Sequence, residues 1–164
     1  MTNNIEVIDF DSRNDIIDYL VKPYLKGKVF HCADKYDFVS IIKDGYIDYT
    51  KRHKNSYGYN NKVVCLCDFR VIDINNPFFS NIMEYLKRGY LFILDEKEYP
   101  NIINPKTERV YNNTKEEGWL IPDFECWYKG ILTLSKISII YNINYINSYI
   151  NQDIYEQVCN YLNF

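Results

Sequence analysis

Two polar side chains stand inside apolar, strand-like segments of this sequence. His31 lies in "KVFHCA" (28–33) and Glu125 lies in "FECWY" (124–128). A neutral imidazole donates one hydrogen bond and accepts another, and a carboxylate can stabilise positive charge. Burying either group is costly unless it is hydrogen-bonded or paired. Both residues are therefore candidates for binding or catalysis. The alternatives are a packed histidine bonded to nearby backbone and an ordinary exposed glutamate.

The cysteines suggest a second kind of chemistry. Cys65 and Cys67 alternate within "KVVCLCDF" (62–69), so both side chains are expected on one face of a strand. With His31, Cys32 and Cys126 from other strands they could form a tetrahedral zinc site. Cys65 or Cys126 could instead act as a nucleophile beside a histidine. Simple burial is the alternative that we favour, because cysteine is among the most buried residue types and no second clustered pair is present.

Several common active-site motifs are missing from the sequence. It contains no GxGxxG at a helix start, no GxxxxGK[ST], no HExxH and no GxSxG. These absences disfavour a Rossmann dehydrogenase, a P-loop NTPase, a zinc protease of the HExxH type and an α/β-hydrolase.

The segments around His31 predict a strand, a helix and a turn. Residues 28–33 read as a buried strand with Val29, His31 and Ala33 on one face. Asp34 can cap the following helix, and Gly45 can end it in the left-handed conformation. The helix carries four apolar side chains: Phe38, Val39, Ile41 and Ile42.

The rest of the chain predicts more strands than helices. Helices are expected after the capping signal at 12–15, from 76 to 88 and from 147 to 163. Strands are expected at 46–49, 62–69 and 90–96, and most of 98–143 reads as β structure, including 99–103, 108–112, 124–128 and 130–143. Without regular βαβ alternation, this order favours an α+β domain with mixed or antiparallel central sheets and a few flanking helices.

Composition bounds the class of protein. The 164 residues suit one domain (1–164), and 47% of them are apolar. A net charge of −3 disfavours stable, nonspecific nucleic-acid binding. Five cysteines without framework spacing, and an N-terminus unlike a signal peptide, lead us to expect a reduced cytoplasmic protein. No apolar stretch approaches the length of a membrane span, so we expect no membrane association.

The order of these parts resembles the H-Y-E class of the ADP-ribosyltransferase fold. The stretch "VFHCADKYDFVSIIKDGYI" (29–47) is similar to the opening "hHxT…lxxIlxxG" of that class, which DarT-like toxins and some abortive-infection proteins share. "YGYNNKVVCLCDF" (57–69) looks like the next element. "IPDFECWYKGILTLSKISII" (121–140) resembles the segment in which the catalytic glutamate precedes the closing strands. The resemblance covers most of residues 28–143, which would form an ADP-ribosyltransferase-like core.

The resemblance implies NAD as a substrate, with no metal. Glu125 would stabilise the positively charged ribose as nicotinamide leaves, and His31 would hydrogen-bond the adjacent ribose. Tyr57 or Tyr59 would stack on the nicotinamide ring, and Trp127 could contribute equally.

One departure concerns the tyrosine of the H-Y-E class, which usually lies in the second strand itself. This chain has Val64, Cys65 and Leu66 there, with aromatic residues only in the preceding loop. Trp119 is a further candidate for the stacking role.

Three functions follow as hypotheses. The first is a mono-ADP-ribosyltransferase or NAD glycohydrolase in the cytoplasm of a bacterial or phage-infected cell, as a toxin or an effector in phage–bacterium conflict, with a protein target as one possible acceptor. The second is a catalytically inert member of the same fold that acts as an anti-defence inhibitor or a receptor for a nucleotide signal. The third is a structural domain with an incidental histidine and glutamate. If the protein binds NAD or a nucleotide signal, His31 and Glu125 should face one cleft with an aromatic ring between them; side chains that point into different regions would weaken both of these hypotheses.

Overall fold

The structure, a computed structural model, describes residues 5–9, 25, 27–49, 62–70, 88–104 and 125–142. Strands outnumber helical segments in this part of the chain, and the fold is α+β, as predicted. The elements in chain order are β1 (Glu6–Asp9), β2 (Val29–Ala33), α2 (Lys35–Asp44), β3 (Tyr46–Ile47), β4 (Val63–Asp68), β5 (Tyr90–Leu94), the 3₁₀ helix η4 (Glu96–Asn101), β6 (Ile102–Ile103), β7 (Glu125–Lys129), β8 (Leu132–Thr133), the 3₁₀ helix η6 (Leu134–Lys136) and β9 (Ile137–Asn142).

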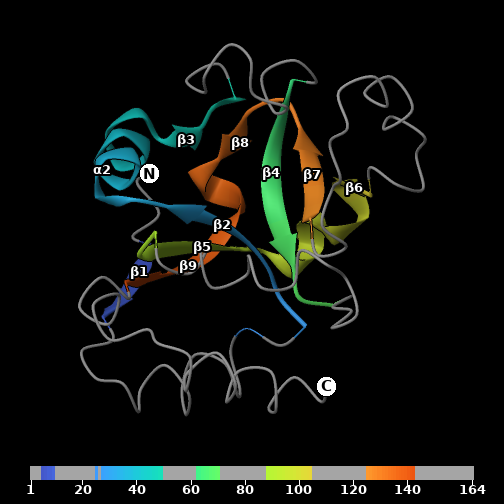
Figure 1. Ribbon diagram of the computed structural model, residues 1–164, viewed down its shortest axis with the longest axis horizontal. Helices are drawn as coiled ribbons and strands as arrows, with labels where there is room; N and C mark the ends of the chain where they lie inside the picture. Colours follow the sequence, from blue (N-terminus) through green and yellow to red (C-terminus); the bar gives the residue numbers. More distant parts are fainter. Residues whose placement is uncertain are drawn as a thin grey trace.

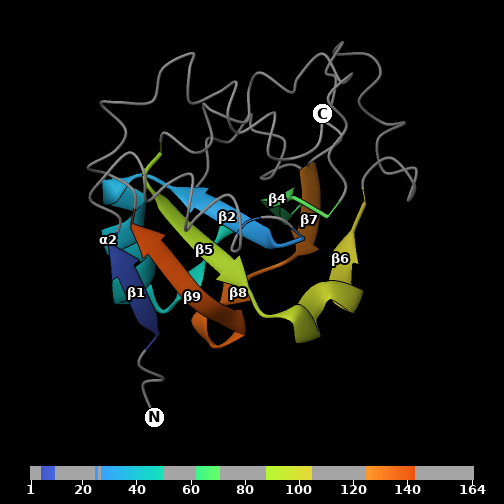
Figure 2. The same ribbon diagram turned by 90° about the horizontal axis from the view of Figure 1, so that it is seen from below.

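Seven of the strands form one sheet in the order β1-β9-β5-β2-β4-β7-β6. β1 pairs with β9 in parallel, and the other described pairs of this sheet are antiparallel. Figure 2 shows β1, β9, β5 and β2 side by side in that order. The strand β1 was not predicted, because "EVID" is short and alternates only weakly between apolar and polar residues.

The helix α2 begins and ends at the residues predicted from the sequence. The Asp34 carboxylate accepts hydrogen bonds from the backbone N–H groups of Tyr36 and Asp37, each at 2.8 Å. Gly45 has φ 82°, and its N–H donates to the carbonyl of Ile41. Because side chains with a Cβ rarely adopt that conformation, the glycine fixes the end of the helix.

The apolar stripe of α2 is narrower than predicted. Phe38 and Ile41 pack against the sheet, with the ring of Phe38 stacked on Tyr90 at a centroid distance of 3.9 Å. Val39 is 63% exposed and Ile42 is exposed as well. A single ten-residue helix on a sheet buries only the residues on its inner side, three and four positions apart.

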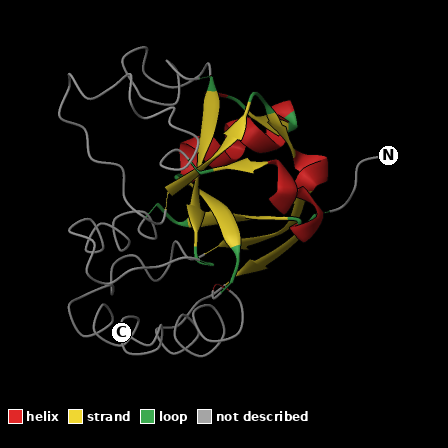
Figure 3. Cartoon of the chain, turned by 90° about the vertical axis from the view of Figure 1, so that its right-hand side faces the viewer, coloured by secondary structure: helices red, strands yellow, loops and turns green. Residues whose placement is uncertain are grey.

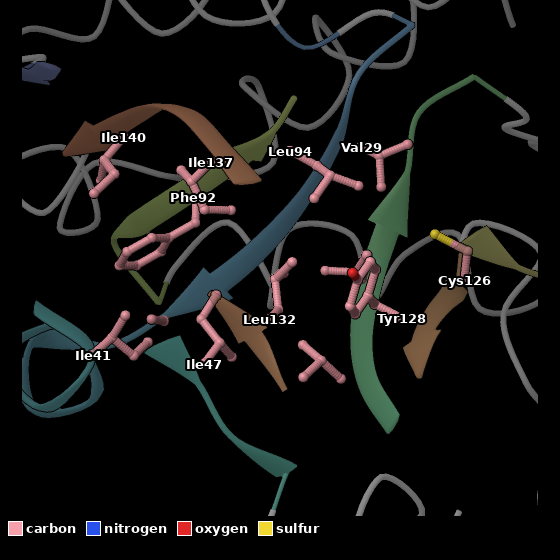
Figure 4. Packing of buried hydrophobic residues seen from close by; sticks show 13 residues of the cluster. Val29, Ile41, Ile47, Phe92, Leu94, Cys126, Tyr128, Leu132, Ile137 and Ile140 are labelled. Carbon is pink, nitrogen blue, oxygen red and sulfur yellow. The ribbon is translucent and has the colours of Figure 1, made fainter. Parts of the chain in front are cut away.

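One face of the large sheet, here called the core face, carries the main hydrophobic core. It packs against Ile41 of α2 and against Ile47 and Leu132 of the small β3–β8 sheet. Figure 4 shows these side chains directed toward one another. The core-face residues contributed by the large sheet are Val29, Ala33, Val64, Leu66, Phe92, Leu94, Cys126, Tyr128, Ile137 and Ile140.

The large sheet changes direction between β2 and β4. These strands pair only at Val29–Asp68 and Phe30–Cys67, whereas β2 pairs with β5 over four residues and β4 with β7 over five. In Figure 1, β4 and β7 run up and down the view, while β2, β5 and β9 run across it. Figure 3 shows the described helical segments gathered toward one side of these strands. The sheet therefore consists of two groups of strands that part beyond Phe30 and Cys67.

Two predicted strands were wrong in part. Within 99–103, the first three residues belong to η4, which Asp95 caps by accepting from the N–H of Lys97 at 3.0 Å, and only Ile102–Ile103 is a strand. Within 130–143, η6 separates β8 from β9. A 3₁₀ helix is held by local caps and bonds, which hydrophobic alternation does not report. The predicted helices after residue 12, at 76–88 apart from residue 88, and at 147–163, the loop 50–61 and the strand 108–112 lie outside the described residues.

Candidate functional site

The strands that carry the two candidate polar residues lie one strand apart. β2 carries His31, β7 carries Glu125, and β4 lies between them. The segments are far apart in the sequence, at 29–33, 63–68 and 125–129, yet they are neighbours in the sheet. Adjacent strands are about 4.8 Å apart, so the two backbones lie within about 10 Å of each other.

His31 lies where β2 and β4 part. Its side chain is 6% exposed, and its Nδ1 lies 3.0 Å from the backbone carbonyl oxygen of Cys65 on β4. A carbonyl only accepts, so Nδ1 is the donor of this hydrogen bond. The imidazole thus connects the two strands just beyond the point where their ladder ends. A packed histidine bonded to nearby backbone was the alternative to a ligand-binding His31, and this contact has that form.

Glu125 is the first residue of β7 and is half-buried. It is paired with Cys67 of β4, which is in turn paired with Phe30 of β2. Directly paired residues point to the same face of a sheet. The three side chains therefore form one row across three strands.

The side chains of His31 and Glu125 project from opposite faces of the sheet. His31 alternates with Val29 and Ala33, its register partner on β5 is Phe92, and all three of these neighbours belong to the core face. Glu125 precedes Cys126, which also belongs to the core face, so the carboxylate points the other way. The structure brings the two strands together, but it does not place the two side chains on one face.

The face that carries Glu125 is called the thiol face here, because three cysteines share it. Cys32 follows His31 on β2, while Cys65 and Cys67 alternate with core-face residues on β4. The register pairs Cys65 with Trp127. The thiol face around Glu125 is formed by Phe30, Cys32, Cys65, Cys67 and Trp127.

The aromatic candidates for stacking have different outcomes. Trp127 is completely buried and packs in a small cluster with Val63, Cys65 and Ile103. The Trp127 indole therefore belongs to the buried hydrophobic cluster on the same face as Glu125. Tyr57, Tyr59 and Trp119 lie outside the described residues.

The predicted zinc ligands are divided between the two faces. Cys65 and Cys67 do share one face, together with Cys32, whereas Cys126 and His31 lie on the core face. Across the ranges that the structure describes, no group of three or more histidine, cysteine, aspartate or glutamate side chains is arranged to hold a metal ion.

Two cysteine thiols of the sheet, Cys67 and Cys126, have a raised pKa. A hydrogen bond with Cys32, and then burial, raises the pKa of Cys67 well above its ordinary value. Burial, and then the charge of Asp68, does the same for Cys126. Cys32, Cys65, Cys67 and Cys126 form no disulfide. A nucleophilic role for Cys126 is not supported, because the thiolate is the reactive species.

Sequence reasoning missed a charged cluster at the end of β4. Asp68 is 7% exposed, and its two carboxylate oxygens each accept from the Arg70 side chain at 2.9 Å. This hydrogen bond raises the pKa of Arg70, and the guanidinium lies 4.7 Å from the ring centre of Tyr99. The spacing Asp-x-Arg directly after a strand was the available signal, because the aspartate can also accept from the Arg70 backbone N–H.

Comparisons of the chain with models of protein families, with curated proteins and with solved structures found no match. In the part of the chain that the structure describes, no helix is both long enough and apolar enough to cross a membrane.

Proposed function

We propose that this protein binds NAD⁺ and cleaves its nicotinamide–ribose bond, as a mono-ADP-ribosyltransferase or an NAD glycohydrolase. The observation that carries the proposal is the adjacency of β2, β4 and β7. These strands hold the histidine, the second element and the glutamate that the resemblance to the H-Y-E class singles out. A sheet that brings these three segments side by side, in that order, supports the proposal.

Glu125 is the proposed catalytic carboxylate. Its position at the start of β7, half-buried and in register with Cys67, limits its freedom to rotate away. As the bond between the ribose anomeric carbon and the nicotinamide nitrogen breaks, the bond's electron pair leaves with nicotinamide and positive charge develops on the sugar. A carboxylate already in place stabilises that charge without reorganisation. Water or another acceptor then attacks the anomeric carbon and releases a proton.

His31 has a supporting role in this proposal. Its Nδ1 is engaged with the Cys65 carbonyl, so the ring fixes the distance between β2 and β4 at the point where they part. This contact holds the histidine strand against the strand that neighbours Glu125. The cellular setting that we propose is the cytoplasm of a bacterial or phage-infected cell, where the protein would act as a toxin or conflict effector.

The test compares Glu125→Gln with the wild type in labelled NAD⁺, in buffer and in cell extract, by nicotinamide release and label transfer. The substitution keeps the side-chain size but removes the charge, so turnover should fall about 100- to 1000-fold while NAD⁺ binding changes little. Glu6→Gln makes the same chemical change on the exposed strand β1 and should leave turnover unchanged. An active wild type matched by Glu125→Gln would exclude Glu125 as the catalytic carboxylate.

A second candidate function is a catalytically inert binding module, either an inhibitor of a protein partner or a receptor for a nucleotide signal. The placement of His31 and Glu125 on opposite faces of the sheet favours the inhibitor form, which needs no cleft shared by the two residues. A wild type that is silent in both assays, but that binds NAD⁺ or another nucleotide in calorimetric titration, would support the receptor form. His31→Ala with unchanged affinity would remove His31 from the ligand contacts.

A further inference from the structure

Strand β1 forms one edge of the large sheet, and among the described strands it has a neighbour on one side only. Its ladder with β9 runs without a break from Glu6 to Asp9. The strand contains no lysine and no proline, which commonly prevent an edge strand from pairing. No segment in the described part of the chain pairs with its outer side. The outward backbone N–H and C=O groups of β1 therefore suit the addition of another strand.

The opposite edge of the sheet is protected. The edge strand there, β6, has only two residues and follows directly after η4. Asn104 and Pro105 come next in the sequence, and a proline has no N–H to donate. Two residues offer too few backbone groups to hold a partner strand. Pairing of β1 with β6 of another copy, which would build an open chain of molecules, is therefore disfavoured.

Exposed hydrophobic side chains gather beside β1. Five large hydrophobic side chains are exposed in the part of the chain that the structure describes, and four of them lie on β1 and α2: Val7 (42%), Tyr36 (73%), Val39 (63%) and Ile42 (44%). Figures 1 and 2 both show β1 and α2 on the same side of the molecule. Val7 is paired with Ile140 of the core face, so its side chain projects to the face that α2 covers. Exposed apolar surface beside an open edge is typical of a protein–protein interface.

The sequence of β1 suits pairing with a second copy of the same strand. An antiparallel pair with a two-fold axis through Val7 places this residue opposite Val7 of the second copy. The same register places Glu6 opposite the apolar Ile8, so it does not face another acidic residue. Like charges directly opposite each other would destabilise the pair. The axis stands perpendicular to the sheet, so the core faces of both copies lie on one side of the joined sheet.

We propose that this protein forms a two-fold symmetric homodimer in which the β1 strands of two copies pair antiparallel and join their large sheets. The two Val7 side chains meet at the axis, on the side of the sheet that carries α2. Strands of four residues bury far less than the roughly 1,000 Å² of a stable interface, so the dimer is weak and forms at micromolar concentrations. The interface is independent of the proposed function, because four strands separate β1 from β7, which carries Glu125.

Sedimentation equilibrium of the chain under reducing conditions, from about 1 to 500 µM, tests the proposal. The wild type should pass from monomer to dimer over this range. Val7→Lys should weaken the dimer about tenfold or more, because two lysines would face each other at the axis. Ile131→Lys is the matched control: its side chain is 46% exposed and lies between β7 and β8, and this variant should dimerise like the wild type.

Three results of this experiment would overturn the proposal. They are a wild type that stays monomeric at every concentration, a Val7→Lys variant that dimerises as strongly as the wild type, and assembly that continues beyond the dimer.

Hydrogen–deuterium exchange of the wild type alone, at both ends of the concentration range, does not depend on how the variants fold. Pairing should slow exchange of the backbone amides of β1 at the high concentration. The amides of β4, which has a strand on each side, should exchange equally at both concentrations. Unchanged exchange in β1, or slower exchange confined to α2, would show that the strand edge is not the interface.

Discussion

The core face and the thiol face of the large sheet are both well covered, but they bury different chemistry. The core face is almost wholly apolar: Phe92, Leu94 and Ile140 each have at most 1% of their surface exposed. The thiol face buries Phe30 and Trp127 just as completely, and it adds three cysteines and the half-buried Glu125. The degree of burial alone therefore does not distinguish residues that only pack from residues that are candidates for catalysis or binding. What separates the faces is the type of side chain that each one buries.

His31 is one of the two buried polar side chains described on the core face, together with Asp68, which is paired with Val29. His31 is accommodated by the hydrogen bond to Cys65 and by a tilted contact with Phe92 at a centroid distance of 6.5 Å. The comparison shows that a polar side chain can be buried within a strand when it forms a hydrogen bond to a neighbouring strand. The predictions below test whether the two faces differ as described.

The largest effect is expected for truncation on the core face. Phe92→Ala removes a fully buried ring that contacts the rings of His31 and Phe38, and the cavity cannot close completely. The free energy of unfolding should fall by about 3–5 kcal/mol. Urea denaturation followed by circular dichroism measures it. A loss below about 1 kcal/mol would mean that the core face is not the main core.

A smaller loss is expected when the link between β2 and β4 is removed. His31→Leu keeps apolar volume but leaves the Cys65 carbonyl without the imidazole donor. An unsatisfied buried acceptor costs about 1–3 kcal/mol of unfolding free energy. His31→Asn, whose amide can donate, should recover part of the loss. Equal stability of His31→Leu and the wild type would show that the bond contributes nothing.

Alkaline pH should distinguish the buried thiols from exposed ones. Folding raises the pKa of Cys67 and Cys126, so each thiol stays protonated in the native protein where an unfolded thiol, with a pKa of about 8.5, ionises. The stabilisation is complete below the unfolded pKa and is lost as pH rises above it toward the folded pKa. The limiting slope is about 1.4 kcal/mol per pH unit for each thiol.

The measurement is the unfolding free energy from about pH 8 to pH 10 for the wild type, Cys67→Ala and Cys126→Ala. Each variant lacks one titrating thiol and should show a shallower decline than the wild type. Parallel curves for all three proteins would contradict the burial of the thiols.

The smallest effect is expected on the outer side of α2. Val39 is 63% exposed, so Val39→Ala removes little buried surface and slightly favours the helix. The free energy of unfolding should change by no more than about 0.5 kcal/mol. The same denaturation assay checks it, and a loss comparable to that of Phe92→Ala would mean that this side of α2 is covered by another molecule or segment.

Much of the local structure was predictable because its causes are local. The cap at Asp34, the left-handed Gly45 and the strands 29–33, 63–68 and 90–94 follow from short-range bonds and alternation, and the structure contains all of them. The helix η4 was missed because its local cap and bonds leave no trace in hydrophobic alternation. The strand β1 was missed because its cause is not local. β1 exists because β9 supplies a partner more than 130 residues away, and no property of "EVID" reports that partner.

The candidate site was predictable only as a set of residues. Alternation predicted that Val29, His31 and Ala33 share a face and that Cys65 and Cys67 share one, and the structure agrees with both. Alternation could not predict whether His31 of β2 and Glu125 of β7 point to the same face of the sheet. That outcome depends on the register through β4, and a shift of one residue would exchange the two faces.

The sequence by itself determined the periodicity of each strand, the ends of α2 and the presence of buried polar residue types, because these depend on neighbours a few positions away. The tertiary structure decided that β2, β4 and β7 are adjacent and that His31 bonds to Cys65. It also decided that Glu125 and His31 point to opposite faces. The physical reason is that antiparallel pairing is set by the joint burial of whole strands far apart in the chain, which no single segment encodes.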